Sequence, residues 1–156
     1  MISSQHVLAL KTIHNRLQKI ESVWAITGSC GFVLQGMELE VNDIDLQTDA
    51  SGAYEVESVF PDMIISNVRF SKSDKFASHC GELTIDGVKV EIMGALQKKL
   101  PDGTWESPVD IKTHREFITF EGMVLPVLSL AYEEQAYRIL GREERANQIK
   151  EWVSRR

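Results

Sequence analysis

Apolar and polar residues at the start of the chain alternate with the period of an amphipathic helix. The apolar positions are Val7, Leu8, Leu10, Ile13, Leu17 and Ile20. Most of them lie three or four residues apart, which predicts a helix that continues to about residue 20 and buries one face. Ser3 and Ser4 precede this pattern and are typical of a helix N-terminal cap.

The next segments predict a buried strand, a short helix and a half-buried strand. An apolar run at 24–26 predicts the buried strand, and the short helix after it ends near Gly36. The half-buried strand consists of Asp43, Ile44, Asp45, Leu46 and Gln47. Its period of two predicts that the two apolar side chains lie on one face and the two carboxylates on the other.

The rest of the chain predicts one more helix, a hairpin-rich stretch and two C-terminal helices. The helix covers 52–60, the strands cover 63–70, 78–85, 88–93 and two parts of 115–128, and the last helices follow Ser129 with a break near Gly141. Asp86-Gly87 is typical of a two-residue hairpin turn. This order predicts an α+β fold with a mixed β-sheet flanked by helices. We expect one domain over 1–156, with a core at about 1–128 and C-terminal helices at about 129–156.

The composition is that of a globular protein. Of the 156 residues, 43% are hydrophobic and 26% are charged. The chain has no apolar run of about 18 residues, which a membrane-spanning helix needs, and its N-terminus does not resemble a signal peptide. We therefore expect a cytoplasmic protein without a membrane partner. Two cysteines are too few for a disulfide scaffold, so buried thiols are expected.

The charge balance disfavours nucleic acid as a partner. Seventeen basic residues face 23 acidic ones, for a formal net charge of -6. Tight binding to a nucleic-acid backbone needs a basic surface that neutralises phosphates. A single nucleotide remains compatible with an acidic protein, because a bound divalent cation can supply the positive charge.

Candidate chemistry gathers where Gly28-Ser29 is followed by Asp43 and Asp45. Two aspartates at i and i+2 on a strand project from the same face, roughly 7 Å apart at the backbone. Their carboxylates can bind one hard cation such as Mg²⁺. The glycine-serine pair lies at a strand-to-helix turn, which offers backbone N–H groups and a hydroxyl to a phosphate.

A third carboxylate lies on the later alternating strand. Glu91 is on the opposite face from Val90 and Ile92. If this strand pairs beside the strand of Asp43 and Asp45, the three carboxylates form one cluster. Such a cluster around two metal ions suits in-line phosphoryl or nucleotidyl transfer.

This combination of residues resembles the polymerase-β nucleotidyltransferase superfamily, over about residues 22–95. The resemblance implies that Gly28 and Ser29 contact the nucleotide phosphates. It also implies that Asp43 and Asp45 bind both metal ions and that Glu91 binds the catalytic metal and acts as the base or helps to orient it. The third acid is a glutamate where aspartate is commoner in the superfamily. The segment between the serine and the first aspartate contains no arginine or lysine.

The resulting hypothesis is an enzyme that moves a nucleoside monophosphate from a nucleoside triphosphate, with ATP as the default, to a hydroxyl of an acceptor. Two Mg²⁺ ions are expected. The acceptor stays open among small molecules, protein side chains and, least favoured, RNA ends. The alternative is a catalytically silent nucleotide- or partner-binding module, such as a toxin–antitoxin component. Base preference and oligomeric state have no signal in the sequence.

Several other polar residues could belong to a functional site. Asp49 is typical of a helix cap rather than a further metal ligand. His79-Cys80 has no second His or Cys pair to complete a metal site, and Cys30 has no nearby histidine to act as a base. Three arginines at 138, 142 and 145 share one helical face if the helix continues through Gly141, and one of them could then reach the triphosphate.

Overall fold

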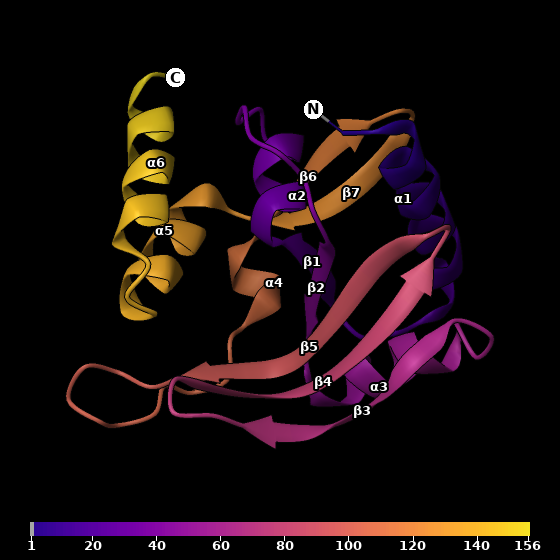
Figure 1. Cartoon of the computed structure of the whole chain (residues 1–156), viewed down its shortest axis with the longest axis horizontal. Helices are drawn as coiled ribbons and strands as arrows, with labels where there is room; N and C mark the ends of the chain where they lie inside the picture. Colours follow the sequence, from indigo (N-terminus) through magenta and orange to yellow (C-terminus); the bar gives the residue numbers. More distant parts are fainter. Residues whose placement is uncertain (1) are drawn as a thin grey trace.

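The computed structural model describes residues 2–156, and it forms one mixed sheet with helices around it (Figure 1). The helices are α1 (Ser4–Arg16), α2 (Gly28–Leu34), α3 (Ala50–Ser58), α4 (Ile111–His114), α5 (Leu130–Ile139) and α6 (Glu143–Ser154), with a 3₁₀ turn at Leu17–Lys19. The strands are β1 (Trp24–Thr27), β2 (Ile44–Thr48), β3 (Ile64–Lys72), β4 (Phe76–Ile85), β5 (Val88–Lys98), β6 (Arg115–Phe120) and β7 (Met123–Leu128). This confirms the predicted α+β class and its C-terminal helices.

The seven strands follow the order β3-β4-β5-β2-β1-β7-β6. Strand β2 pairs in parallel with β5 and antiparallel with β1, and β1 pairs in parallel with β7. Both parallel pairs join segments that are distant in sequence. Strand β2, which contains Asp45 and begins directly after Asp43, therefore lies near the middle of the sheet, between β1 and β5.

Local signals in the sequence account for most element boundaries. The Ser3 side chain caps α1 by accepting a hydrogen bond from His6 N–H. Asp86 and Gly87 both have positive φ, at 51° and 79°, as a two-residue hairpin turn requires. The helix α1 is shorter than expected and ends at Arg16, and the chain continues as the 3₁₀ turn.

Strand β5 extends beyond its predicted end. The prediction ended too early because a bulge interrupts the alternation of side chains between the two faces of the sheet. The prediction ended the strand at Met93, whereas it continues to Lys98. Ala95 has a φ of 53°, and the pairing with β4 shifts between Ala77 and His79. A bulge adds an unpaired residue and changes which face the later side chains occupy.

The main core lies on one face of the sheet and is covered by α1 and α3. Its fully buried residues include Leu10 from α1, Phe60 after α3, and Ile44, Leu46 and Ile92 from the central strands. This is the face that the period-two pattern predicted to be apolar. The carboxylates of β2 and β5 therefore lie on the other face.

A smaller cluster holds the two C-terminal helices to α2. Its buried members are Phe32, Met37, Leu130 and Ile149, with Tyr137 and Trp152 packed against them. The break between α5 and α6 falls at Gly141, where φ is 79°. Because the helix does not continue through this glycine, the three arginines predicted to share one helical face do not lie on one helix. Within residues 2–156, no helix combines the length and the apolar character needed to cross a membrane.

Candidate active site

Four residues from four adjacent strands form one row across the sheet. Asp45 of β2 is the register partner of Thr27 on β1 and of Glu91 on β5. Glu91 is in turn the partner of Glu82 on β4. Directly opposed residues of paired strands point to the same face. The condition set by the sequence, that the strand of Glu91 pairs beside the strand of Asp45, is therefore fulfilled.

Gly28 lies at the end of this row, where β1 turns into α2. Its φ is +72°, and a Cβ atom at this position would lie 2.6 Å from Oδ2 of Asp45. Only glycine combines this backbone conformation with so close an approach. Ser29 follows in the first turn of α2 and is half-buried. The predicted glycine-serine turn is thus adjacent to the predicted metal ligand Asp45.

Lys89 lies among the carboxylates of the row. Its Nζ is 3.1 Å from Oε1 of Glu91, 3.6 Å from Oε1 of Glu82 and 3.9 Å from Oδ2 of Asp43. Among residues 2–156, no three His, Cys, Asp or Glu side chains are gathered closely enough to hold one metal ion. The ligand roles of Asp43, Asp45 and Glu91 stay predictions, and two of these residues, Asp43 and Glu91, pair with Lys89.

Asp45 has an unusual protonation equilibrium. Burial is the largest cause that raises its pKa to about 7, and the negative charges of Glu91 and Asp43 raise it further. Lys89 and Arg142 act in the opposite direction. Burial and the two neighbouring carboxylates both disfavour the charged form of Asp45, and a bound cation would favour it.

Glu133 is a residue of this site that the sequence interpretation did not assign to it. An acidic residue in the first turn of a helix ordinarily interacts with the helix dipole at the surface, yet Glu133 is only 2% exposed. Both oxygens accept from the Thr27 hydroxyl at 2.8 Å, and Oε2 accepts from Gly28 N–H at 3.0 Å. Burial raises its pKa to about 7. Since Gly28 N–H donates to this carboxylate, it is not free for a phosphate.

A cavity of about 420 Å³ lies over the row. The sheet forms one wall, and the opposite wall comes from α5 and the turn after it, with Tyr137 and Arg142. The Arg142 guanidinium is 5.6 Å from the Tyr137 ring centre. Gln47 also lines the cavity, and within residues 2–156 its buried Oε1 has no hydrogen-bond partner. An unpaired buried acceptor is costly, so a donor group of a ligand would stabilise this position.

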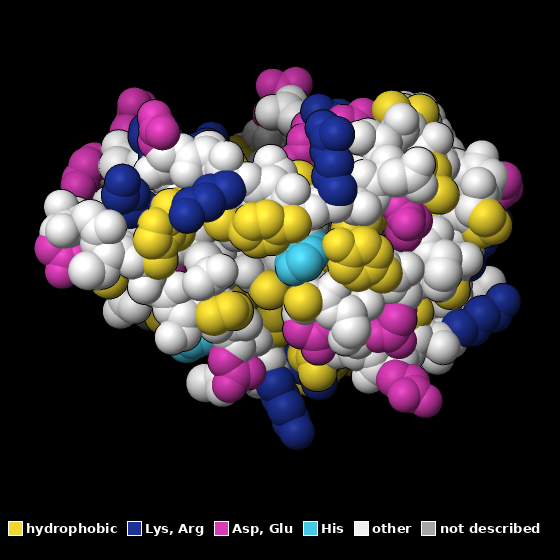
Figure 2. Space-filling model, turned by 90° about the horizontal axis from the view of Figure 1, so that it is seen from below, with side chains coloured by type: hydrophobic (Ala, Val, Ile, Leu, Met, Phe, Trp, Pro, Cys, Tyr) yellow, Lys and Arg dark blue, Asp and Glu magenta, His cyan; other side chains and the backbone are white. Residues whose placement is uncertain are grey.

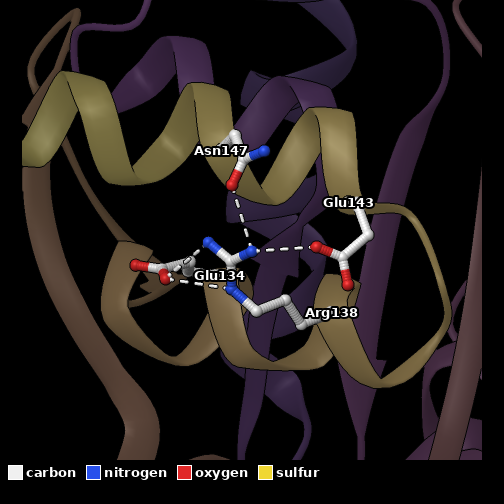
Figure 3. A network of polar contacts seen from close by, with 4 residues as sticks. All are labelled: Glu134, Arg138, Glu143 and Asn147. Atoms are coloured by element: carbon white, nitrogen blue, oxygen red, sulfur yellow. Dashed lines mark hydrogen bonds and ion pairs between the residues drawn. The ribbon is translucent and has the colours of Figure 1, made fainter.

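Arg138 is engaged on the surface and does not line the cavity (Figure 3). Its guanidinium pairs with Glu134 at 3.0 Å and with Glu143 at 3.2 Å, and it donates to Asn147. Arg138 is thus paired with acidic side chains of α5 and α6. Of the three C-terminal arginines considered, Arg142 lines the cavity.

Three other residues, Asp49, Cys30 and Cys80, were candidates for a functional role. The Asp49 side chain caps α3 by accepting from Gly52 N–H. Cys30 is buried, and burial raises its pKa to about 12, which disfavours a thiolate nucleophile. Cys80 is half-buried and lines the cavity, so the expectation of a buried thiol is wrong for this residue.

His79 belongs to the opposite face of the sheet. It hydrogen-bonds to the Tyr54 hydroxyl and contacts the Phe70 ring edge-on. The view from below shows a histidine between hydrophobic side chains on the surface of the molecule (Figure 2). Because neighbouring strand residues point to opposite faces, His79 and Cys80 cannot act as a joint metal site.

The sequence matches the model of the aminoglycoside-2''-adenylyltransferase family over residues 9–153. The chain belongs to this family. The match includes every residue of the row and both C-terminal helices, so it covers the two walls of the cavity. It agrees with the resemblance to polymerase-β nucleotidyltransferases, and the family is one of nucleotidyltransferase enzymes.

Two solved structures are similar over nearly their whole length. TM1012 of Thermotoga maritima, a candidate nucleotidyltransferase, has 49% sequence identity and a TM-score of 0.87, over 100% of this chain and 97% of that one. The lincosamide antibiotic adenylyltransferase LnuA, solved with lincomycin bound, has 13% identity and a TM-score of 0.57, over 96% and 97%. The second likeness shows the fold alone. A comparison with curated proteins found no match.

Proposed function

We propose that the protein transfers the AMP group of ATP to a hydroxyl of a small-molecule acceptor, with Mg²⁺ as the cofactor. The single observation that carries this proposal is the register of Asp45 with Glu91 directly beside the Gly28 turn. This arrangement of two carboxylates and a glycine turn at one end of a cavity supports a site for a metal ion and a phosphate. The family name supports adenylyl transfer and hence ATP as the donor.

The residues of the site fit a magnesium cofactor. Mg²⁺ takes oxygen ligands, usually one or two carboxylates together with substrate phosphates. One or two of the predicted ligands Asp43, Asp45 and Glu91 would hold the ion, and a cation beside Asp45 would favour its charged form, which burial and two neighbouring carboxylates disfavour. Bound Mg²⁺ would neutralise the phosphates and activate the attacking hydroxyl.

The protein itself contributes positioning and proton transfer. We expect the Ser29 hydroxyl and the adjoining backbone N–H groups to orient the phosphates, while Glu91 accepts the proton of the acceptor hydroxyl. The acceptor oxygen forms a bond to the α-phosphorus. The bond from that phosphorus to the bridging oxygen breaks, and its electron pair leaves with pyrophosphate.

Binding should depend strongly on the cation. A triphosphate brings several negative charges to a row that already contains carboxylates. Two unit charges at about 4 Å repel each other by roughly 4 kcal/mol at an effective dielectric constant of about 20. Mg²⁺ must offset this repulsion before the phosphates can approach the sheet.

Calorimetric titration with ATP tests the proposal, in Mg²⁺ and again in excess chelator. We expect binding only with Mg²⁺, together with slow release of pyrophosphate as water replaces the acceptor. Ser29→Ala should weaken ATP binding by about 1.5 to 3 kcal/mol, because a hydrogen bond to a charged group is lost. Equal affinity in Mg²⁺ and chelator would refute the metal-dependent site.

A further inference from the structure

The order of the residues in the row across the sheet distinguishes two ends of the cavity, one at β1 and the other at β4 and β3. The Gly28 turn lies at β1, followed by Asp45 on β2, Glu91 on β5 and Glu82 on β4, with β3 at the edge. In an in-line displacement the attacking and leaving oxygens lie on opposite sides of the phosphorus. If pyrophosphate leaves on the side of the Gly28 turn, the acceptor hydroxyl must approach from the side of β4 and β3.

The β3–β4 end of the cavity has its own chemistry. Besides Glu82 and Lys98, it is lined by four serines and one arginine, namely Ser66, Ser71, Ser73, Ser78 and Arg69. Ser66 and Arg69 are three residues apart, so a regular strand would direct them to opposite faces. The pairing of β3 with β4 shifts register between these two residues, and both line the cavity. The irregularity therefore brings Arg69 to the same side as the serines.

Arg69 is a free cation at this end of the cavity. Within the part of the chain that the structure describes, its side chain has no ion pair with an acidic residue. The other cation at this end, Lys98, is 1% exposed and is bound to Glu106 and to the Tyr132 hydroxyl. Arg69 is thus the cation that can bind a ligand, and a guanidinium suits carboxylate or phosphate oxygens.

The nearby acidic groups are already engaged. Glu82 and Glu91 share the ammonium group of Lys89. Glu133 accepts from Thr27 and Gly28 at the far end of the row. The remaining negative charge lies beside Asp45, where the proposed cofactor binds. Because Asp43, Glu82 and Glu91 share the single lysine Lys89, they keep a net negative charge. At the β3 edge, by contrast, an ammonium group of an acceptor would meet the unpaired cation Arg69, which repels it.

We infer that the β3–β4 end of the cavity is the acceptor subsite and that it selects a hydroxyl compound carrying an anionic group, which Arg69 binds. This inference rests on the proposed adenylyl transfer and narrows its acceptor. The serine hydroxyls donate to and accept from the other polar groups of the acceptor. A polycationic aminoglycoside, the substrate class in the family name, does not match this end of the cavity.

Binding of glycerol 3-phosphate, glucose 6-phosphate and 3-phosphoglycerate to the full chain tests the inference. Each titration contains saturating Mg²⁺ and α,β-methylene-ATP, so that the nucleotide site is occupied and cannot bind the probe. At least one probe should bind, and Arg69→Gln should weaken it about tenfold or more. Lys72→Gln is the matched control, because Lys72 is on the same strand, lies over the Trp105 ring and does not line the cavity. This control should leave the affinity unchanged.

Transfer assays distinguish a failure of the acceptor inference from a failure of the proposed adenylyl transfer. With Mg²⁺ and ATP, kanamycin should give no AMP adduct by mass spectrometry, whereas the bound probe should increase pyrophosphate release above the rate with water. An adduct of kanamycin, no binding of any probe, or equal probe affinity in Arg69→Gln would overturn the acceptor inference. If ATP binding and slow hydrolysis persist in those cases, the adenylyl-transfer proposal still stands. If ATP does not bind at all, that proposal fails first.

Discussion

Two carboxylates flank Gly28, one from each wall of the cavity. Their pKa values are similar, but their surroundings differ. Asp45 comes from the sheet, and Glu133 comes from α5 on the opposite wall. Burial raises both pKa values to about 7. Asp45 then meets two further negative charges, from Glu91 and Asp43, whereas Glu133 accepts three hydrogen bonds from Thr27 and Gly28.

This difference separates the sheet side of the cavity, which we call the reactive wall, from the α5 side, which we call the supporting wall. A carboxylate that is destabilised by like charges gains from a cation, as expected of a metal ligand. A carboxylate whose oxygens are occupied by protein donors has little left to offer a ligand. We therefore expect Asp45 to act in the reaction and Glu133 to position the Gly28 turn against the C-terminal helices. Each prediction below tests this division.

The largest effect is expected for Asp45→Asn on transfer. Loss of a ligand to the proposed metal should lower the rate of pyrophosphate release by at least about a hundredfold. Glu133→Gln should lower it by less than about tenfold, because the amide can still accept from Thr27 and Gly28. Asp49→Asn is the control, since asparagine also caps α3. Equal losses for Asp45→Asn and Glu133→Gln would remove the distinction between the two walls.

Gly28→Ala should disturb both walls at once. An alanine Cβ would lie 2.6 Å from Asp45, and alanine is strained at a φ of +72°. We expect a loss of about 2–4 kcal/mol in the free energy of unfolding, measured with denaturant. Gly122→Ala is the matched control, because its φ is +77° but nothing lies within 4 Å of the added atom. That control should cost only about 1–2 kcal/mol, and equal losses would mean that the contact with Asp45 relaxes freely.

Glu133→Ala tests the supporting wall by itself. It removes the acceptor of Thr27 and Gly28 and leaves space beside them, so the free energy of unfolding should fall by about 1–3 kcal/mol. Glu134→Ala removes a neighbouring carboxylate that pairs with Arg138 near the surface, and it should cost less than about 1 kcal/mol. Thermal or chemical unfolding of the two variants gives the comparison. A smaller loss at position 133 than at position 134 would contradict the positioning role.

The smallest effect is a dependence of the metal-free stability on pH. A carboxyl with a raised pKa binds its proton more tightly in the folded state, so the folded state loses stability as the pH rises from the unfolded pKa of about 4 to the folded pKa of about 7. The Asp45 carboxyl should account for a loss of about 2 kcal/mol between pH 5 and pH 8, after allowance for solvent screening, and Glu133 adds a loss of the same sign. Asp45→Asn should be flatter over this range and more stable than the wild type at pH 8. Unfolding without Mg²⁺ at several pH values measures this, and a slope of the opposite sign would contradict the charge excess.

Much of the reactive wall follows from the sequence. The period of two at residues 43–47 and 88–93 determines which side chains share a face, because alternate residues of a strand always do. The pair Gly28-Ser29 after a buried strand marks the turn, since few residues other than glycine adopt a positive φ there. These local rules predicted Asp43, Asp45 and Glu91 as one group, once the two strands are neighbours.

The tertiary structure alone decided the rest. Strand neighbours are set by global packing, so the register of Asp45 with Glu91 and the place of Lys89 among the carboxylates could not be derived from local patterns. Glu133 is more than a hundred residues from Gly28 in the sequence, and an acid in the first turn of a helix is ordinarily solvated. Its burial became visible only when α5 packed across the cavity. The bulges near Arg69 and Ala95 changed the faces of later side chains, because one extra residue in a strand reverses an alternation that the sequence pattern assumes to be regular.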